Sequence, residues 1–277
     1  MAEQHGRTGT TVAAAGLTAC VCLVATGCTG GAAAEDARPA DPVRTLHRAA
    51  DALVDAGTSK ARTSMEMATG GTRVTIRGEG VYDYTRRRGR LKVLLPQDPA
   101  GQPEHRPITE LLAPGALYMK NRGAGVPADK WVRVDTATLS DGNLVTGGAT
   151  DPYAAAEVLR GTRRATYAGR TEVAGTPVHH YRGTADLATA AEAASSGGRA
   201  SLAAAAKGFA TAVVPFDVFL DDEGRIRKIR HRFSFVNGHR QSTVAVASTT
   251  LLYDFGAPAD VRLPPARDIY AGRIAEE

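Results

Sequence analysis

The sequence predicts a fold of the α+β class, in which one domain combines a long antiparallel sheet with a few helices. Short segments that alternate apolar and polar residues recur along most of the chain, separated by turns rich in Gly, Pro and Arg. Asp-Pro pairs open two segments that have helical spacing. Because no linker interrupts this order, a single domain is expected over residues 41–268, followed by a C-terminal tail at 269–277.

The first helix is expected between Asp41 and Gly57. Asp41 is a suitable N-cap, Pro42 fits the first turn because its missing N–H would have no partner there, and Gly57 is a typical C-cap. Apolar residues at helical spacing form one stripe, made of Val43, Leu46, Ala50, Leu53 and Val54. The pattern predicts one amphipathic helix.

A series of short strands follows this helix. The expected segments are 61–67, 74–84, 91–95, 116–120 and 131–135. Gly78 and Gly80 stand on the apolar side of the second segment, and glycine inside a strand is typical of a bend or a bulge. The sheet is therefore expected to curve strongly.

The second half of the chain repeats the same devices. Asp151 and Pro152 open a short helix that ends at Gly161. The Ala-rich segment 186–212 has helical propensity and is split at residues 195–198. Strands are expected at 164–173, 177–184, 216–220, 225–235 and 242–255.

Residues 1–27 have the features of a secretion signal. A polar start with Arg7 precedes an uncharged apolar run from Val12 to Thr26, and small residues precede Cys28. The run is short and rich in small residues for a spanning helix, which needs about 20 apolar residues. A cysteine directly after small residues resembles the lipobox of bacterial lipoproteins, whose thiol receives a diacylglycerol. Residues 28–40 are then expected to be a flexible tether.

Two cysteines compete for this role. Cys20 has Leu17 three residues before it, as in the usual lipobox, whereas Cys28 has Ala25 there. Cleavage before Cys20 would shorten the apolar run and leave residues 22–25 as an apolar stub. The sequence therefore favours Cys28 as the lipidated residue. A signal without lipidation and an uncleaved N-terminal anchor are the alternatives.

Composition fits an exported domain with an ordinary core. All three cysteines lie at or before position 28, so the rest of the chain can form neither a disulfide nor a thiolate metal site. With 34 basic and 29 acidic residues, the formal net charge is +5. This mild excess suits a location near anionic lipid or cell-wall polymer, but it is too diffuse to indicate nucleic-acid binding.

The sequence carries no motif of a hydrolase elbow, a zinc protease or a phosphate loop. His179 and His180 alternate along a strand, so one metal ion cannot easily use both, and His231 and His239 are expected at the surface. The acidic residues 221–223 are expected to form a hairpin turn rather than a cation site. No catalytic residue, cofactor or metal site is expected, and an extracytoplasmic hydrolase is the weakest alternative.

Two basic runs stand out. Four arginines lie within residues 86–90, at an expected hairpin tip. Between residues 225 and 232, basic residues are interleaved with Ile226 and Ile229, so this strand could present a basic row to a bilayer. The simpler interpretation is a solvated sheet face whose charges prevent edge pairing.

The order of these segments resembles the LppX/LprG group of actinobacterial lipoproteins, in the LolA-like superfamily. The resemblance covers about residues 41–268 and rests on the patterns at 116–120, 130–135, 173–183, 215–229 and 253–265. It implies a single-domain, strongly curved antiparallel β half-barrel with α-helices packed on its concave face. It also implies that a lipid or a lipidated molecule binds between sheet and helices, and it brings no catalytic residue.

The expected function is that of a lipoprotein anchored at the extracytoplasmic face of the cell membrane, which binds and can carry a lipid or another apolar ligand. The expected cavity is lined by Leu46, Leu53, Val54, Met65, Met67, Val74, Ile76, Tyr82, Tyr84, Leu202 and Phe209. The alternative is a non-catalytic scaffold or sensor of the same fold that acts through a protein partner. In that alternative the Ala-rich insert at 186–212 helps to fill the interior.

Overall fold

The computed structural model describes residues 41–69, 72–96, 106–123, 125–237 and 242–271. The chain divides into two units, Met1–Glu35 and Asp36–Glu277, and every described residue belongs to the second. The expected signal peptide, the expected tether, Cys20 and Cys28 lie outside the described residues. Within the described ranges, no helix has both the length and the apolar character needed to cross a membrane.

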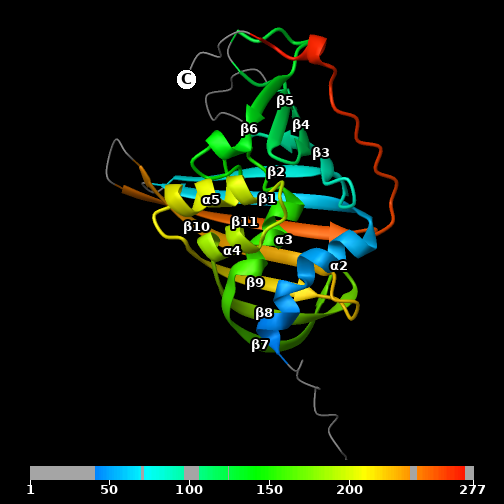
Figure 1. The fold of residues 1–277 in the computed structure, drawn as a ribbon, viewed down its shortest axis with the longest axis vertical. Helices are drawn as coiled ribbons and strands as arrows, with labels where there is room; N and C mark the ends of the chain where they lie inside the picture. The colour runs from blue at the N-terminus through cyan, green and yellow to red at the C-terminus, as the bar shows by residue number, and fades with distance from the viewer. Residues whose placement is uncertain (1–40, 70–71, 97–105, 124, 238–241, 272–277) are drawn as a thin grey trace, which may run out of the picture. The chain divides into compact units, whose positions relative to one another are not determined.

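One sheet of eleven antiparallel strands organises this unit (Figure 1). From the central strand β1 the chain runs outward in sequence to β6 at one edge, then begins again with β7 at the other edge and returns to β11, which pairs with β1. Among the described strands β6 and β7 do not pair, so the sheet is open. The strands are β1 (Thr58–Thr69), β2 (Thr72–Asp83), β3 (Arg88–Leu94), β4 (Ile108–Ala113), β5 (Ala116–Lys120), β6 (Val132–Asp135), β7 (Thr162–Val173), β8 (Thr176–Asp186), β9 (Val213–Leu220), β10 (Ile226–Asn237) and β11 (Ser242–Tyr253).

The helices lie over one face of the sheet, here called the concave face; the opposite face is called the outer face (Figure 1). The α4–α5 hairpin is inserted between β8 and β9, within the Ala-rich segment. The expected α+β class, with one curved, unclosed antiparallel sheet, is confirmed. The helices are α1 (Pro42–His47), α2 (Ala49–Ala56), α3 (Pro152–Val158), α4 (Leu187–Ala193) and α5 (Arg199–Gly208), with 3₁₀ turns η1 (Thr136–Thr138), η2 (Leu159–Gly161) and η3 (Ala266–Asp268).

The expectation of a single first helix was wrong, because the helix is broken at Arg48. Asp41 caps α1 by accepting two backbone N–H bonds, and Gly57 ends α2 with a φ of 77°, as the sequence predicts. At Arg48 the backbone N–H binds a carbonyl three residues earlier, at 3.3 Å, so the regular ladder of bonds four residues apart is interrupted. Leu46 before the break and Leu53 after it are both fully buried.

Close strand approaches and register shifts accompany the curvature. A Cβ on Gly80 would lie 1.8 Å from the carbonyl oxygen of Arg90, so only glycine allows β2 to pass β3 this closely. The register shifts within the β7–β8 pair and within the β9–β10 pair, as at β-bulges. Ala174 and Gly175 link β7 to β8 with φ values of 49° and 80°, which is the two-residue turn that hairpins prefer.

The concave face and the helices share one buried core, and alternate residues of each strand enter it. His231, expected at the surface, is instead buried at 1% exposure between Ile229 and Phe233 on the concave side of β10, so that expectation was wrong. The physical reason is strand alternation, which places every second residue of β10 inside. Burial lowers the pKa of His231 to about 3, so its ring is neutral at pH 7.

The segment after β11, called the C-terminal strap (residues 256–271), crosses back to the β6 edge of the sheet (Figure 1, red). Trp131, just before β6, forms a parallel bridge with Ile269. The Trp131 N–H donates to the Asp268 carbonyl at 2.8 Å, and its carbonyl accepts from the Tyr270 N–H at 2.8 Å. Val261 of the strap is buried at 7% exposure. The strap is thus joined to the edge by backbone hydrogen bonds.

Candidate functional site on the concave face

The residues expected to line a cavity lie on the concave face or on the helices above it. Eight of them belong to the buried core: Leu46, Leu53, Met65, Ile76, Tyr82, Tyr84, Leu202 and Phe209. The other three, Val54, Met67 and Val74, are partly buried and pack against that core. Their role in holding a ligand stays a prediction.

These side chains contact one another and their neighbours directly. The rings of Tyr82 and Tyr84 lie 4.9 Å apart, and the Tyr84 hydroxyl lies 2.7 Å from the Ser59 hydroxyl. Phe209, at the end of α5, stacks on Phe233 of β10 with ring centres 4.8 Å apart. In this arrangement the space between α5 and β10 is occupied by the protein's own side chains.

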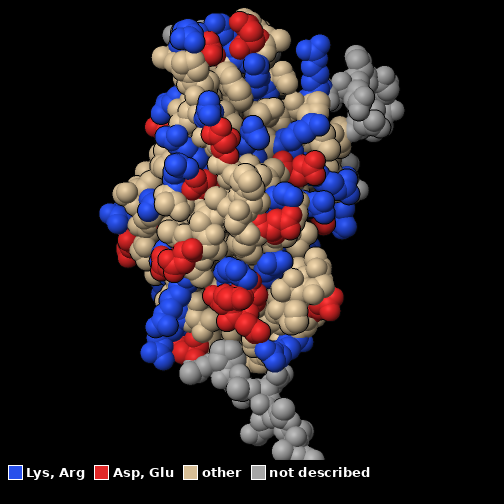
Figure 2. Space-filling model, turned by 90° about the vertical axis from the view of Figure 1, so that its right-hand side faces the viewer, with Lys and Arg blue, Asp and Glu red and all other residues tan. Residues whose placement is uncertain are grey.

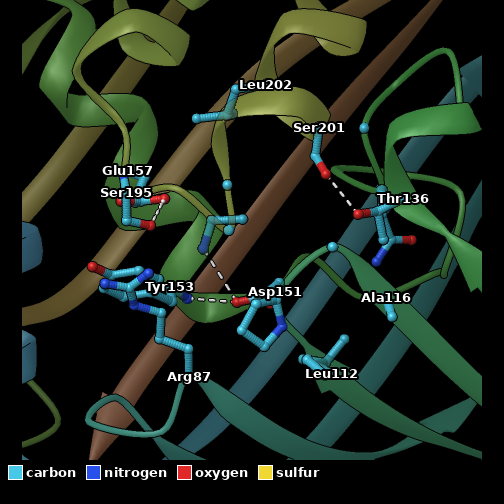
Figure 3. Close-up of a pocket in the computed structure, with 18 of the residues that line it drawn as sticks. Arg87, Leu112, Ala116, Thr136, Asp151, Tyr153, Glu157, Ser195, Ser201 and Leu202 are labelled. Carbon is cyan, nitrogen blue, oxygen red and sulfur yellow. Dashed lines mark hydrogen bonds between the residues drawn. The ribbon is translucent and has the colours of Figure 1, made fainter.

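A small pocket, here called the polar pocket after the buried acids on its walls, opens beside this packed region and has both apolar and polar lining (Figure 3). Its volume is about 50 Å³, and five separate parts of the chain enclose it: the β2–β3 hairpin, the β4–β5 turn, the loop after η1, the start of α3 and the α4–α5 hairpin. Two residues of the expected cavity, Tyr82 and Leu202, are among its walls. The lining residues are Tyr82, Arg87, Leu112, Ala113, Pro114, Gly115, Ala116, Thr136, Gly142, Asn143, Asp151, Tyr153, Ala154, Glu157, Ser195, Gly197, Gly198, Ser201 and Leu202.

Asp151 lies on one wall of the polar pocket because it is the N-cap of α3. Its Oδ1 accepts the N–H groups of Tyr153 at 2.7 Å and Ala154 at 3.1 Å, and its Oδ2 accepts the Tyr82 hydroxyl at 3.3 Å. Burial raises the pKa of Asp151 to about 6, against the lowering effect of these hydrogen bonds. Asp151 therefore joins α3 to β2 at the pocket.

Glu157 holds the link between α4 and α5 against α3. Its carboxylate accepts the Ser195 N–H at 2.8 Å and the Ser195 hydroxyl at 3.0 Å, while Arg160 Nε lies 3.6 Å away. A Cβ on Gly198 would lie 2.2 Å from Glu157 Oε2, so any larger residue there would force the Glu157 carboxylate to shift. Glu157 is 1% exposed, and its hydrogen bonds compensate the burial.

Two further contacts join polar side chains at the pocket. The hydroxyls of Thr136 and Ser201 lie 2.6 Å apart and join η1 to α5 (Figure 3). The guanidinium of Arg87 lies 5.6 Å from the centre of the Tyr153 ring. These contacts serve the packing of loops and helices against the sheet.

The size and chemistry of the polar pocket limit what it can do. A water molecule needs about 10–15 Å³ measured in this way, so a volume of about 50 Å³ holds a few waters or an equally small polar group. Sites for larger small molecules measure about 300–1,000 Å³. The lining contains no His, Cys or Lys side chain. Among the described residues, no cluster of three or more His, Cys, Asp or Glu side chains could hold a metal ion.

Glu110 is a second buried acid that sequence reasoning missed. It is 0% exposed on the concave side of β4, and neither carboxylate oxygen has a hydrogen-bond partner among the described residues. Burial raises its pKa to about 8, although the charge of Arg122 acts in the opposite direction, so Glu110 is mostly protonated at pH 7. Glu110 alternates in step with the apolar residues of its strand and lies opposite Leu91, and this alternation could have indicated that it is buried.

Other side chains singled out from the sequence have structural partners. Asp221 forms the expected acidic turn, in which its side chain accepts the Arg225 N–H at 2.9 Å. His179 lies 3.0 Å from Asp222, and His180 lies 2.9 Å from Asp217, on the opposite side of β8. The two histidines thus face different acids.

Comparison with known proteins gives structural likeness only. No protein-family model matches the sequence, and no curated protein matches it. The crystal structure of lipoprotein LppX from Mycobacterium tuberculosis is similar with a TM-score of 0.46 and 9% identity, over 79% of this chain and 97% of that one. LprF from Mycobacterium bovis is similar with a TM-score of 0.38 and 14% identity, over 80% of this chain and 96% of that one.

A LolA superfamily protein from Nitrosomonas europaea is similar with a TM-score of 0.34 and 10% identity, over 78% of this chain and 95% of that one. The chain is thus similar in fold to lipoprotein LppX, to LprF and to a LolA superfamily protein.

Proposed function

We propose that this chain is a lipid-anchored protein of the extracytoplasmic face of the cell membrane and that it works by binding rather than by catalysis. The apolar run from Val12 to Thr26, followed by small residues and Cys28, supports export and lipidation. The polar pocket supports a non-enzymatic role, because its acids are engaged in capping α3 and in holding the α4–α5 link.

The observation that carries the proposal is the packing of the concave face by the protein's own side chains. Leu202 and Phe209 are buried there, and Phe209 stacks on Phe233. An acyl chain in the same place would have to displace them. We therefore favour a scaffold or sensor lipoprotein with a filled interior, which acts through its surface on a protein partner.

A second candidate is a carrier that binds a lipid after α5 moves away from the sheet. It is favoured by how lightly α5 is held, since only Ser201, Leu202 and Ala205 of its ten residues are buried. Displacement of α5 would uncover an apolar surface that includes Phe233, and Met65 and Met67 suit contact with irregular apolar guests. The driving force would be burial of apolar area, about 25 cal/mol per Å².

The lipid anchor is tested by metabolic labelling with a fatty acid in the producing cell. The full chain is expected to be labelled and to sediment with membranes, and Cys28→Ser is expected to lose both properties. The matched control Cys20→Ser should keep them if processing occurs at Cys28. Labelling that survives Cys28→Ser and is lost with Cys20→Ser would assign the anchor to Cys20 instead.

The filled interior is tested by titrating a fluorescent fatty acid into the purified full chain. We expect no saturable rise in fluorescence with the natural sequence, because its concave face offers no free apolar volume at Phe209. Phe209→Ala creates such a volume and is the positive control. A saturable rise with the natural sequence that Phe209→Asp abolishes would favour the carrier.

A further inference from the structure

Basic side chains gather on the outer face of the sheet, opposite the helices. We define the basic face by Arg62 of β1, Arg77 of β2, Arg90 and Lys92 of β3, and Arg230 and Arg232 of β10. These side chains point to the outer face, because successive residues of a strand point to opposite faces and the neighbours of each cation point to the concave face.

The flanking residues make this direction explicit. Arg62 lies between the buried residues Ala61 and Thr63, and Arg230 lies between the buried residues Ile229 and His231. The strands that carry the basic face are neighbours, in the order β3, β2, β1, β11 and β10. The six cations are thus spread over one surface, which also carries Glu66 of β1 and Glu79 of β2, and basic and acidic side chains are likewise mixed on the side of the unit drawn in Figure 2.

Acidic residues neutralise only one part of the basic face. On β9, Asp217 accepts a hydrogen bond from Arg232 at 2.8 Å, and Arg182 and His180 also contact it. Burial would raise the pKa of Asp217, but these hydrogen bonds outweigh it and lower the pKa to about 2. Arg230 lies 3.9 Å from Glu66.

By contrast, the β2–β3 part of the basic face forms no ion pair among the described residues, although Glu79 lies opposite Arg62 and Lys92 in the strand register. Among the described residues, no ion pair engages Arg77, Arg90 or Lys92. Arg62 contacts the Tyr253 ring, with its guanidinium 5.1 Å from the ring centre, but it too has no acidic partner in the described ranges. Cations without partners are free to bind external anions.

The surface is hollowed and partly apolar where these free cations lie. Two adjoining hollows, of about 530 and about 490 Å³, share Arg90 and Thr109, and the second also includes Lys92. Trp131 lines the first hollow beside Asp260 and Arg262 of the C-terminal strap, and Glu79 lines the second. Leu94, next to Arg77 across the strands, is 47% exposed. Cations, hollows and exposed apolar groups together match phospholipid headgroups and the region just below them.

We propose that the basic face docks onto an anionic phospholipid surface. The proposal rests on the lipid anchor proposed above, which brings the domain to the membrane. Residues 28–40 would span at most roughly 45 Å when fully extended, so the domain stays close to the bilayer. Docking through the outer face leaves the helix-covered side turned away from the membrane and accessible to a protein partner.

The test uses the full chain on vesicles with a single reporter group. The described residues contain no cysteine, so Thr249→Cys provides a site for a fluorescent label. Its neighbours Ser248 and Thr250 are buried on the concave face, so Thr249 lies on the outer face. The matched control is Glu192→Cys, at an exposed position of α4 on the helix side. Each labelled chain is reconstituted into vesicles that carry a headgroup quencher, with or without phosphatidylglycerol in phosphatidylcholine.

The label at position 249 is expected to be quenched several-fold more than the label at position 192, and only in vesicles with phosphatidylglycerol. Molar salt should remove the difference, because the screening length then falls to about 3 Å. The combined substitutions Arg62→Gln, Arg77→Gln and Arg90→Gln should remove it as well. Equal quenching at the two positions, or no dependence on phosphatidylglycerol, would overturn the proposal.

Flotation of the chain with the two kinds of vesicle distinguishes a failure of the docking proposal from a failure of the anchor proposal. A chain that floats with phosphatidylglycerol vesicles but not with pure phosphatidylcholine would uphold docking and refute the anchor. A chain that floats with both, with no preference of the outer face for the membrane, would uphold the anchor and refute docking.

Discussion

At the scale of single residues, Glu110 is the side chain most out of keeping with its surroundings. It is an acid with 0% exposure whose carboxylate oxygens have no hydrogen-bond partner among the described residues. Its folded pKa of about 8 lies above the ordinary value of 4.5. Between these values the folded state keeps a proton that the unfolded state has lost, so stability must fall as pH rises through this window.

The effect of Glu110 can be isolated between pH 6 and pH 8. Asp151, with a folded pKa of about 6, adds to the fall at the lower end of this range, whereas His231, which binds a proton near pH 6.5 only in the unfolded state, acts in the opposite direction, so the contribution of Glu110 is read from the difference between the natural sequence and Glu110→Gln. We expect the free energy of unfolding to fall by about 2–3 kcal/mol over this range and Glu110→Gln to remove that fall. Urea unfolding at both pH values measures it. Glu79→Gln, an exposed change on the outer face, should leave the slope as it is, and a slope that persists in Glu110→Gln would contradict the assignment.

The buried polar residues mark the limit of prediction from sequence at this scale. His231 lies between Arg230 and Arg232 in the chain, so the local sequence reads as a polar surface. Only the apolar residues Ile229 and Phe233, two positions away on each side, indicate that His231 points inward. Glu110 likewise shares a phase with Ile108 and Leu112 on β4. In both strands the alternation of inward and outward residues could be read from the sequence, but a histidine and a glutamate are residue types that are seldom buried.

At the scale of elements, the α4–α5 hairpin decides how the concave face is used. Its helices are short and rich in Ala, and isolated helices of this length are marginal in water. They are held by a few larger contacts, among them Leu202, Phe209 and the bond from Ser195 to Glu157. Each of these contacts should therefore carry a large share of the stability of the hairpin.

Phe209→Asp tests this share. The side chain is 7% exposed and lies between Phe233 and Phe235, with ring centres at 4.8 and 4.6 Å, so the change leaves a void and buries a charge. We expect a loss of at least about 3–5 kcal/mol in the free energy of unfolding, measured with urea. Lys207→Asp, an exposed change two residues earlier, should cost no more than about 1 kcal/mol. Equal effects of the two changes would show that Phe209 does not pack as described.

Elements were predictable where their signals are local. Asp41 and Asp151 cap helices, residues 195–198 separate α4 from α5, and Gly175 turns β7 into β8. The polar pocket could not be read in this way, because its walls come from five segments that are distant in the sequence. The break at Arg48 was also missed, since the apolar stripe continues across it.

At the scale of the whole domain, the two faces of the sheet differ in character. The concave face is packed by α2 to α5 into one core, and the outer face carries cations that lack partners on β1 to β3. The antiparallel meander could be anticipated, because such a sheet needs only neighbouring pairings, but β4 was not among the expected strands. The joining of β1 to β11 could not be anticipated, since it brings together residues nearly two hundred positions apart, such as Lys60 and Tyr253.

The filled concave face is the central claim, and the lipid that accompanies the protein from its own membrane tests it most directly. The full chain is purified from cells, and the lipid released by solvent without cleaving covalent acyl chains is counted per chain. We predict far less than one lipid per chain for the natural sequence, and a larger amount for Phe209→Ala, in which a cavity opens beside Phe233. One lipid or more per natural chain, reduced by Leu202→Trp, would contradict the filled interior and identify the protein as a carrier.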